Sequence, residues 1–273
     1  MLLVNACVPA SHPGVVTRAA FESPSSSLPA MKSFTAHYPQ AAPRSNNDLS
    51  LDFIDLSFRM ESGKDLRVLT RFEGPITIRV IGAPPSTLGP DLTRLISRLR
   101  SEARIDISPT KAADANITIE AVSRSKIRQV LPEAACFVAP NVSSIDEYKK
   151  VRRNAQTNWS LMTTRKRIAI FLPNDASPQE VRDCLHEEVA QALGPLNDLY
   201  RLPDSVFNDD NVHTVLTGFD MMILRAYYDP ALRSGMTRGQ VSNALPGIFA
   251  RINPRGTSTK ARFVTRTPRE WNL

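Results

Sequence analysis

The fold and the candidate site of this chain depend on one stretch, residues 184–198, which runs Cys-Leu-His-Glu-Glu-Val-Ala-Gln-Ala-Leu-Gly-Pro-Leu-Asn-Asp. Glu187 and Gln191 are four residues apart, so on a helix they lie on one side, one turn apart, and Glu188 follows the first of them.

The zinc-peptidase motif His-Glu-x-x-His has this spacing, with two imidazole ligands and a Glu that acts as general base. The stretch resembles the helix that carries this motif, with an acid and an amide in the two ligand positions.

Residues 178–193 are predicted to form this helix. Residues 177–180, Ser-Pro-Gln-Glu, match a capping box with Pro at the first helical position, and a Gly-Pro pair follows the helix. At 100° per residue, Glu188 falls inside the apolar face, and Glu187 and Gln191 lie at its border. A buried acid is costly unless it is paired, hydrogen-bonded or catalytic, and burial raises its pKa. Glu188 is therefore either a structural acid, bonded to the backbone or to an Arg, or a catalytic one.

The segments on both sides of this helix favour an α+β fold. Residues 75–80 and 115–119 are predicted strands, and residues 91–104 are predicted to form an amphipathic helix between them. After residue 193 come Ser-Val-Phe at 205–207 and then a Leu-Thr-x-x-Asp helix start. In this order the chain resembles a matrixin-like metzincin, whose zinc helix is followed by a Ser-x-Met turn under the metal. Phe207 stands where that Met would be.

The resemblance implies a degenerate zincin-like fold. It would contain a mixed sheet of about four to five strands, with the helix 178–193 in the active-site position and further helices toward the C-terminus. Ser205 and Phe207 would form the turn beneath the site.

Residues from about 50 to 250 more closely resemble an uncharacterised bacterial family, the domain of unknown function numbered 2927. The shared features are a Cys, a Glu-Glu-x-x-Gln-x-Leu-Gly segment, an Asn-Asp pair and a Ser-x-Phe-Asn-Asp-Asp segment. In this chain they are Cys184, residues 187–194, Asn197 with Asp198, and residues 205–210. No reaction is established for the family, so the resemblance implies a fold rather than an activity. Its members commonly carry export signals, which implies a place in the cell envelope.

The ligand positions of the helix offer only oxygen. Glu187, Gln191 and either Asn197 or Asp198 would supply carboxylate and amide groups, whereas zinc prefers Cys and His. Such a set is closer to what calcium or magnesium binds, and water would have to complete the shell. We expect no bound metal and no other cofactor. The alternative is one divalent metal, zinc or calcium.

None of the four histidines is expected to supply a zinc ligand. His12 and His37 belong to the low-complexity start of the chain, and His213 stands alone in the sequence. His186 has Ala190 where a second imidazole ligand would be needed. We therefore expect His186 to be a solvated surface residue.

Two classes of function fit these residues. In a pseudoenzyme, hydrogen bonds among Glu187, Gln191 and Asn197 replace metal coordination, and a peptide or protein binds along an edge strand without being cleaved. In an active hydrolase, Glu188 is the general base, and the other positions, with Asp198 as a further candidate, are metal ligands or acid partners. The sequence leaves open whether the chain is an enzyme, with the pseudoenzyme preferred. Candidates for an acidic cleft beside the site are Asp209 and Asp210.

The chain has 273 residues, enough for one domain with two tails. Residues 1–48 are rich in Ser, Pro and Ala and are predicted to be a disordered tether. Residues 49–252 would form the domain, and residues 253–273 a basic flexible tail. The first seven residues resemble the end of a lipoprotein signal, with Cys7 as the lipidation site that would anchor the protein to a membrane. We expect a periplasmic, lipid-anchored protein, or a cytoplasmic one if this start is not an export signal.

Cys136 and Cys184 are the two cysteines inside the predicted domain. In an exported protein they could form one disulfide, whereas in the cytosol they would be buried free thiols. A nucleophilic role is least favoured, because Cys184 lies on the apolar face of the helix, where the pKa of a thiol rises.

The formal net charge is +7. Basic residues gather around Trp159 and in the C-terminal tail, where they are solvated or contact anionic lipid. The sequence has no helix-turn-helix, zinc-finger or RNA-recognition pattern, so we expect no nucleic-acid partner. The expected partner is a peptide or a protein of the envelope.

Overall fold

A mixed β-sheet forms the centre of the molecule. The structure is a computed structural model that describes residues 16–19, 44–208 and 213–258. In this part the sheet has six strands in the order β1-β5-β6-β4-β2-β3. β2 is parallel to β3 and β4, and β4 is parallel to β6, whereas β5 is antiparallel to β6 and β1 is antiparallel to β5. The strands are β1 (Val16–Ala19), β2 (Ile76–Gly82), β3 (Ile107–Pro109), β4 (Ile117–Val122), β5 (Ala134–Pro140) and β6 (Ile168–Pro173).

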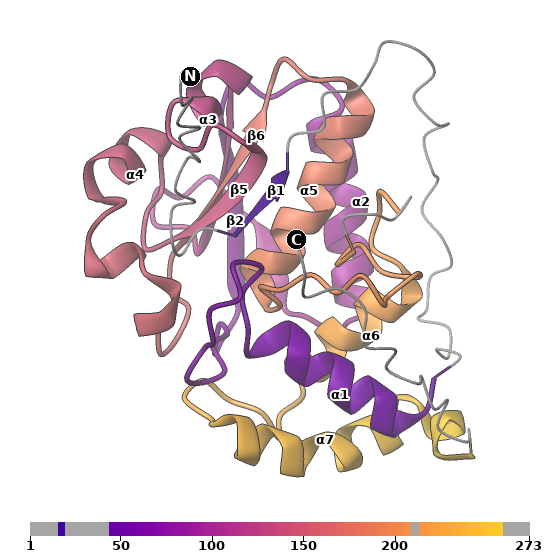
Figure 1. The fold of residues 1–273 in the computed structure, drawn as a ribbon. Coiled ribbons are helices and arrows are strands. Elements are labelled where there is room, and N and C mark those ends of the chain that lie inside the picture. Colours follow the sequence, from indigo (N-terminus) through magenta and orange to yellow (C-terminus); the bar gives the residue numbers. More distant parts are fainter. Residues whose placement is uncertain (1–15, 20–43, 209–212, 259–273) are drawn as a thin grey trace, which may run out of the picture.

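Helices cover both faces of the sheet. Figure 1 shows α2 and α5 on one side and α3 and α4 on the other, with α1 and α7 packed together below. Short 3₁₀ turns follow α4 and α7. The α-helices of the described residues are α1 (Asn46–Ser57), α2 (Leu88–Ser101), α3 (Arg124–Arg128), α4 (Ile145–Val151), α5 (Pro178–Leu193), α6 (Gly218–Tyr227) and α7 (Arg238–Ile252).

Strand β6 explains why the sheet needs helices on both faces. All of its residues are buried. Ile168, Ile170 and Leu172 belong to the larger core, which includes α5, whereas Ala169 and Phe171 belong to a smaller core on the other face. A strand that is covered on both faces is apolar throughout instead of alternating. β6 is therefore the central layer between two hydrophobic cores.

The mixed α+β class expected from the sequence is confirmed, and so is the helix 178–193, whose capping box between Ser177 and Glu180 is formed in both directions. The expected strands and amphipathic helix correspond to β2, β4 and α2, each displaced by a few residues. Strands β2 to β6 agree with the expected four to five strands, and β1, from the predicted tether, adds a sixth at the edge.

The ends of the domain also need correction. α1 begins at Asn46 and is capped by the side chain of Ser45, so the domain starts before residue 49. At the other end, Asn253 is buried and its side-chain amide donates to Asn46 Oδ1 at 3.0 Å. A 3₁₀ turn over Pro254–Ser258 follows. The beginning of the expected tail is thus part of the folded domain, because it packs against the first helix.

Within the described residues, none of the helices combines the length and the apolar character that crossing a bilayer requires. Cys7, the candidate lipidation site, lies outside the described residues.

Candidate functional site

The C-terminal part of helix α5 is buried on every side. From Cys184 to Leu193 all of its residues are buried, because the sheet covers one face and α2 packs on another. His186 has no exposed surface, and its Nδ1 accepts a hydrogen bond from the main-chain N–H of Leu216 at 3.1 Å. Burial, together with the positive charge of Arg98, lowers the pKa of His186 to about 3. The prediction of a solvated surface His was wrong, since a single helix pattern does not show how many sides its neighbours cover.

The structure brings together three carboxylates from three segments. Glu187 lies on α5, Asp198 lies in the loop after it, and Glu61 lies in the loop after α1. One carboxylate oxygen of each is within 4.8 Å of the others. Gln191 joins them, because its Nε2 donates to Glu61 Oε1 at 2.9 Å. We call these four residues the acid–amide cluster.

Glu61 was missed by sequence reasoning. It precedes Gln191 by 130 residues, and nothing in its local sequence distinguishes it from a solvated surface acid. Its position is fixed by main-chain hydrogen bonds: its N–H donates to Leu196 O at 3.2 Å, and the N–H of Leu196 donates to Leu56 O at 3.0 Å. Gly63, with φ of +78°, allows the tight turn that follows. The loop after α1 is therefore bound to the loop after α5.

Asn197 and Asp198 make different contacts. The side chain of Asn197 is directed toward α1 and donates from Nδ2 to the main-chain oxygen of Asp55 at 2.9 Å. Asp198, one residue later, belongs to the acid–amide cluster. The side chain of Gln191 is thus joined to Glu61, and that of Asn197 to the end of α1.

Glu188, the candidate general base, has no exposed surface. It does not belong to the group of acids that could share a metal ion. A general base has to come within hydrogen-bond reach of the substrate proton that it removes. In this structure a substrate can reach Glu188 only if the surrounding segments move. Asp209 and Asp210, the candidates for an acidic cleft, lie outside the described residues.

Arg165 holds the C-terminal end of α5. It is fully buried, and its guanidinium donates to the main-chain oxygens of Gln191, Ala192 and Gly194, with 2.8 Å to Ala192 O. These carbonyls have no partner within the helix, and they form the negative end of its dipole. The guanidinium also lies 5.2 Å from the centre of the Trp159 ring. The guanidinium group of Arg165 thus supplies hydrogen bonds to the carbonyl oxygens at the C-terminal end of α5. The loop that contains Asp198 begins at this end of the helix.

The turn at residues 205–207 supports the same loop. Ser205 Oγ donates to Asp220 Oδ1 at 2.6 Å, and it accepts from the N–H of Phe207 at 3.0 Å. Phe207 is fully buried, and its main-chain oxygen accepts from the N–H of Leu199 at 2.9 Å. Burial raises the pKa of Asp220 to about 6, against hydrogen bonds that lower it. The turn therefore fixes the residue next to Asp198.

A disulfide joins Cys136 of β5 to Cys184 of α5. Of the two alternatives left by the sequence, the structure contains the bonded pair. The bond ties the strand next to the sheet edge to the helix that carries Glu187.

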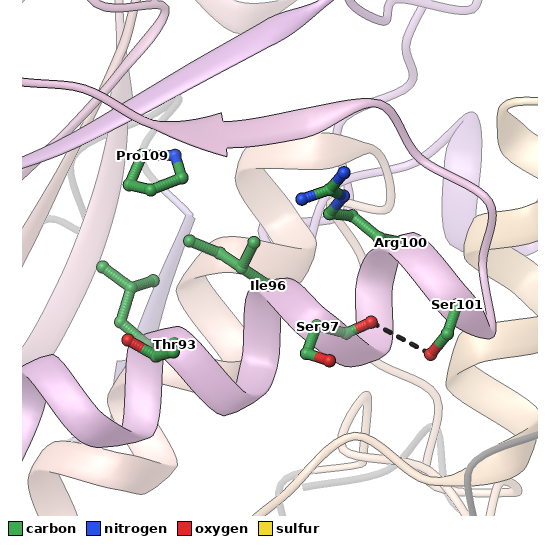
Figure 2. Close-up of a pocket in the computed structure, with 7 residues that line it drawn as sticks. Thr93, Ile96, Ser97, Arg100, Ser101 and Pro109 are labelled. Carbon is green, nitrogen blue, oxygen red and sulfur yellow. Dashed lines mark hydrogen bonds between the residues drawn. The ribbon is translucent and has the colours of Figure 1, made fainter.

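A shallow pocket lies elsewhere, between α2 and the edge strand β3. Figure 2 shows Ile96 and Pro109 facing one another across it, with Arg100 near one end. Ser101 Oγ donates to Ser97 O at 2.9 Å. None of its lining residues belongs to the acid–amide cluster or was singled out in the sequence.

The acid–amide cluster does not suit zinc. Among the described residues no His or Cys belongs to it, and Cys184 is held in the disulfide. Carboxylate and amide oxygens are instead the ligands of hard cations such as calcium and magnesium.

The molecule is thus a disulfide-bonded α+β domain with an oxygen-only cluster at the C-terminal part of its central helix. The chain belongs to the family described as "Protein of unknown function (DUF2927)", whose model matches residues 46–247. The match begins at the first residue of α1 and ends within α7. No curated protein and no solved structure matches the chain.

Proposed function

We propose that this protein is a non-catalytic, zincin-like module of the bacterial cell envelope that binds a peptide or a protein segment along β5. The observation that carries the proposal is the way in which β1 is added to the sheet. An extended segment from residues 16–19 pairs with β5 in antiparallel register, with Val16 opposite Val138 and Arg18 opposite Cys136.

The edge of β5 is open to such an addition. The matched family region begins at residue 46, so β1 comes from outside it. Without β1, the outer edge of β5 would present main-chain N–H and C=O groups that need partners. Addition of a strand at an edge supplies those hydrogen bonds and depends little on side chains, which is a common mode of peptide recognition. The N-terminal segment therefore occupies the place that a bound peptide would take.

Two features favour binding over catalysis. The two ligand positions of a zinc-peptidase helix hold Glu187 and Gln191, and the general-base position holds the fully buried Glu188. The zincin-like part of the proposal rests on the unit of β2, α2 and β4, on the antiparallel strand β5 and on the helix after β6. The proposal is thus a zincin-like scaffold that keeps a peptide-binding edge without a zinc site.

The placement in the envelope rests on the disulfide. Bonds such as that between Cys136 and Cys184 persist in oxidising compartments and are rare in the cytosol. The disulfide also restricts the movement of β5, the strand that would pair with a ligand, because it links this strand covalently to α5.

The test uses the full chain with Thr17→Pro and Arg18→Pro, which removes main-chain donors from β1. A fluorescent peptide with the sequence of residues 14–21 should bind this variant about tenfold or more tightly than it binds the wild type. The reason is that the tethered strand competes in the wild type at an effective concentration on the order of millimolar. Fluorescence anisotropy measures the affinity.

The matched control is Ser25→Pro with Ser26→Pro, which adds two prolines to the N-terminal segment outside β1. This control should behave like the wild type. A peptide carrying the same two prolines as the first variant should not bind. Absence of peptide binding to the Thr17→Pro, Arg18→Pro chain, or equal binding of both peptides, would refute recognition by strand addition.

A further inference from the structure

We propose that Glu61, Glu187, Gln191 and Asp198 form a binding site for a hard divalent cation, with calcium as the ion that fits best. The proposal goes beyond peptide binding at β5 and does not depend on it, because the cluster lies on α5, on the loop after α5 and on the loop after α1.

The carboxylates are arranged as cation ligands are. Each of Glu61, Glu187 and Asp198 offers one oxygen, and these oxygens lie within 4.8 Å of one another. Glu187 is only 2 % exposed, whereas Glu61 and Asp198 are partly exposed. Like charges at this separation disfavour each other's ionised form, and a bound cation reverses that effect. The carboxylate oxygens of Asp198 are buried, so Glu61 marks the side from which an ion and its water would enter.

Gln191 gives independent evidence for a ligand. The residue has no exposed surface, and among the described residues its Oε1 has no hydrogen-bond partner. The nitrogen of the same amide contacts Glu61 Oε1 at 2.9 Å, so the amide group is directed into the cluster. A buried acceptor without a partner carries a desolvation cost. The two ends of an amide are interchangeable in their placement, and with the oxygen beside Glu61 both side chains can bind the same cation.

The donor set selects among ions. Calcium takes six to eight oxygen ligands from carboxylates, amides and water in flexible geometry. Zinc prefers nitrogen and sulfur, and magnesium demands near-ideal octahedral geometry and usually keeps several waters. The cluster has three carboxylates and one amide, and each carboxylate can bind through one or two oxygens. These oxygen ligands suit calcium, although two of them occupy the zinc-ligand positions of a zinc-peptidase helix.

Such an ion would join three segments of the chain. Glu61 follows α1, Glu187 and Gln191 lie on α5, and Asp198 lies in the loop after α5. The main-chain bonds of Glu61 and Leu56 to Leu196 already place two of these segments side by side. We infer that the cation locks the loop after α1 onto the end of α5, and that it stabilises the fold without taking part in a reaction.

The experiment is calorimetric titration of the chelator-treated full-length protein with calcium chloride, beside the variants Glu61→Gln and Asp198→Asn. The wild type should bind about one ion per chain, and each variant should bind at least about tenfold more weakly, because it loses a charged ligand. Glu61→Gln keeps an acceptor for the Gln191 amide, so this variant should fold. Glu133→Gln, an exposed acid, is the matched control and should bind like the wild type.

Thermal unfolding gives a second, independent readout. At a calcium concentration about 100 times the dissociation constant, the melting temperature of the wild type should rise by about 5–10 °C. In chelator, Glu61→Gln and Asp198→Asn should be as stable as the wild type or more so, because each removes one of three adjacent negative charges. The order of stability should therefore reverse when calcium is added, which a merely structural role of these acids would not produce.

Two results would overturn the proposal: no saturable binding of calcium to the wild type, or calcium binding that both variants retain. Parallel titrations with magnesium and zinc complete the test. Tighter binding of either ion at these residues would overturn the assignment to calcium. These outcomes are separate from the peptide assay at β5, so the failure of one proposal can be told from the failure of the other.

Discussion

Cys136 of β5 and Cys184 of α5 are covalently joined, so the strand that receives β1 is fixed to the helix that carries the acid–amide cluster. The two cysteines are 48 residues apart in the sequence. The bond therefore closes a long loop, which restricts the unfolded chain more than the folded one.

Replacement of both cysteines by Ala should lower the free energy of unfolding by about 2–4 kcal/mol, since this is the usual contribution of a disulfide that closes a loop of this size. Urea unfolding monitored by circular dichroism measures the change. Cys7→Ala serves as the control for removal of a cysteine and should leave stability unchanged. An unchanged midpoint in the double variant would show that the bond adds nothing to the fold.

Arg165→Met should destabilise the protein by about 2–4 kcal/mol, because the carbonyls at the end of α5 would lose their donors while staying buried. Arg165→Lys should recover only part of the loss, because an ammonium group lacks the planar fork that reaches several carbonyls at once. Chemical denaturation of each variant is the measurement. Lys166→Met, at the exposed neighbouring position, is the control. If Lys fully replaces Arg, charge alone accounts for the effect.

His186 should make the protein sensitive to acid. Its folded pKa, about 3, lies below the ordinary value of 6.5, so the unfolded state takes up the proton first as the pH falls. The stability that the neutral side chain contributes is complete above about pH 6.5 and is lost as the pH falls toward 3. The total loss of unfolding free energy is about 5 kcal/mol.

The check is the free energy of unfolding measured from pH 7 to pH 4 for the wild type and for His186→Asn, whose amide oxygen can replace Nδ1 as acceptor for Leu216. The stability difference between the two proteins should shift in favour of the variant as the pH falls. A difference that does not change with pH would mean that His186 keeps an ordinary pKa in the folded protein.

Gly194→Ala should destabilise the protein by about 1–3 kcal/mol through overpacking. A Cβ at this position would lie 2.9 Å from the nearest ring atom of Tyr227, which is itself buried. Gly89→Ala is the matched control, since it lies in α2 with no atom within 4 Å of the added Cβ, and it should be neutral or slightly stabilising. Thermal unfolding of both variants distinguishes the steric effect from a general effect of Gly replacement.

The sequence predicted those features that depend on neighbouring residues. The bounds of α5 follow from the Ser177–Glu180 capping box and from Gly194, because caps are made within a few residues of the helix end. The spacing of Glu187 and Gln191 likewise places them on the same side of the helix. Hydrophobic periodicity was enough to find β2, α2 and β4, although not their exact ends.

Only the tertiary structure decided which residues complete the site. It placed Glu61, from a loop far away in the sequence, beside Glu187 and Asp198. It also directed the side chain of Asn197 toward α1 and buried His186 beneath the loop before α6. It also added β1 to the edge of β5. Each of these depends on contacts between segments that are distant along the chain, and the energy of such a contact depends on packing and burial that no local pattern contains. The sequence therefore determined the helix and its polar positions, whereas the fold determined what those positions face.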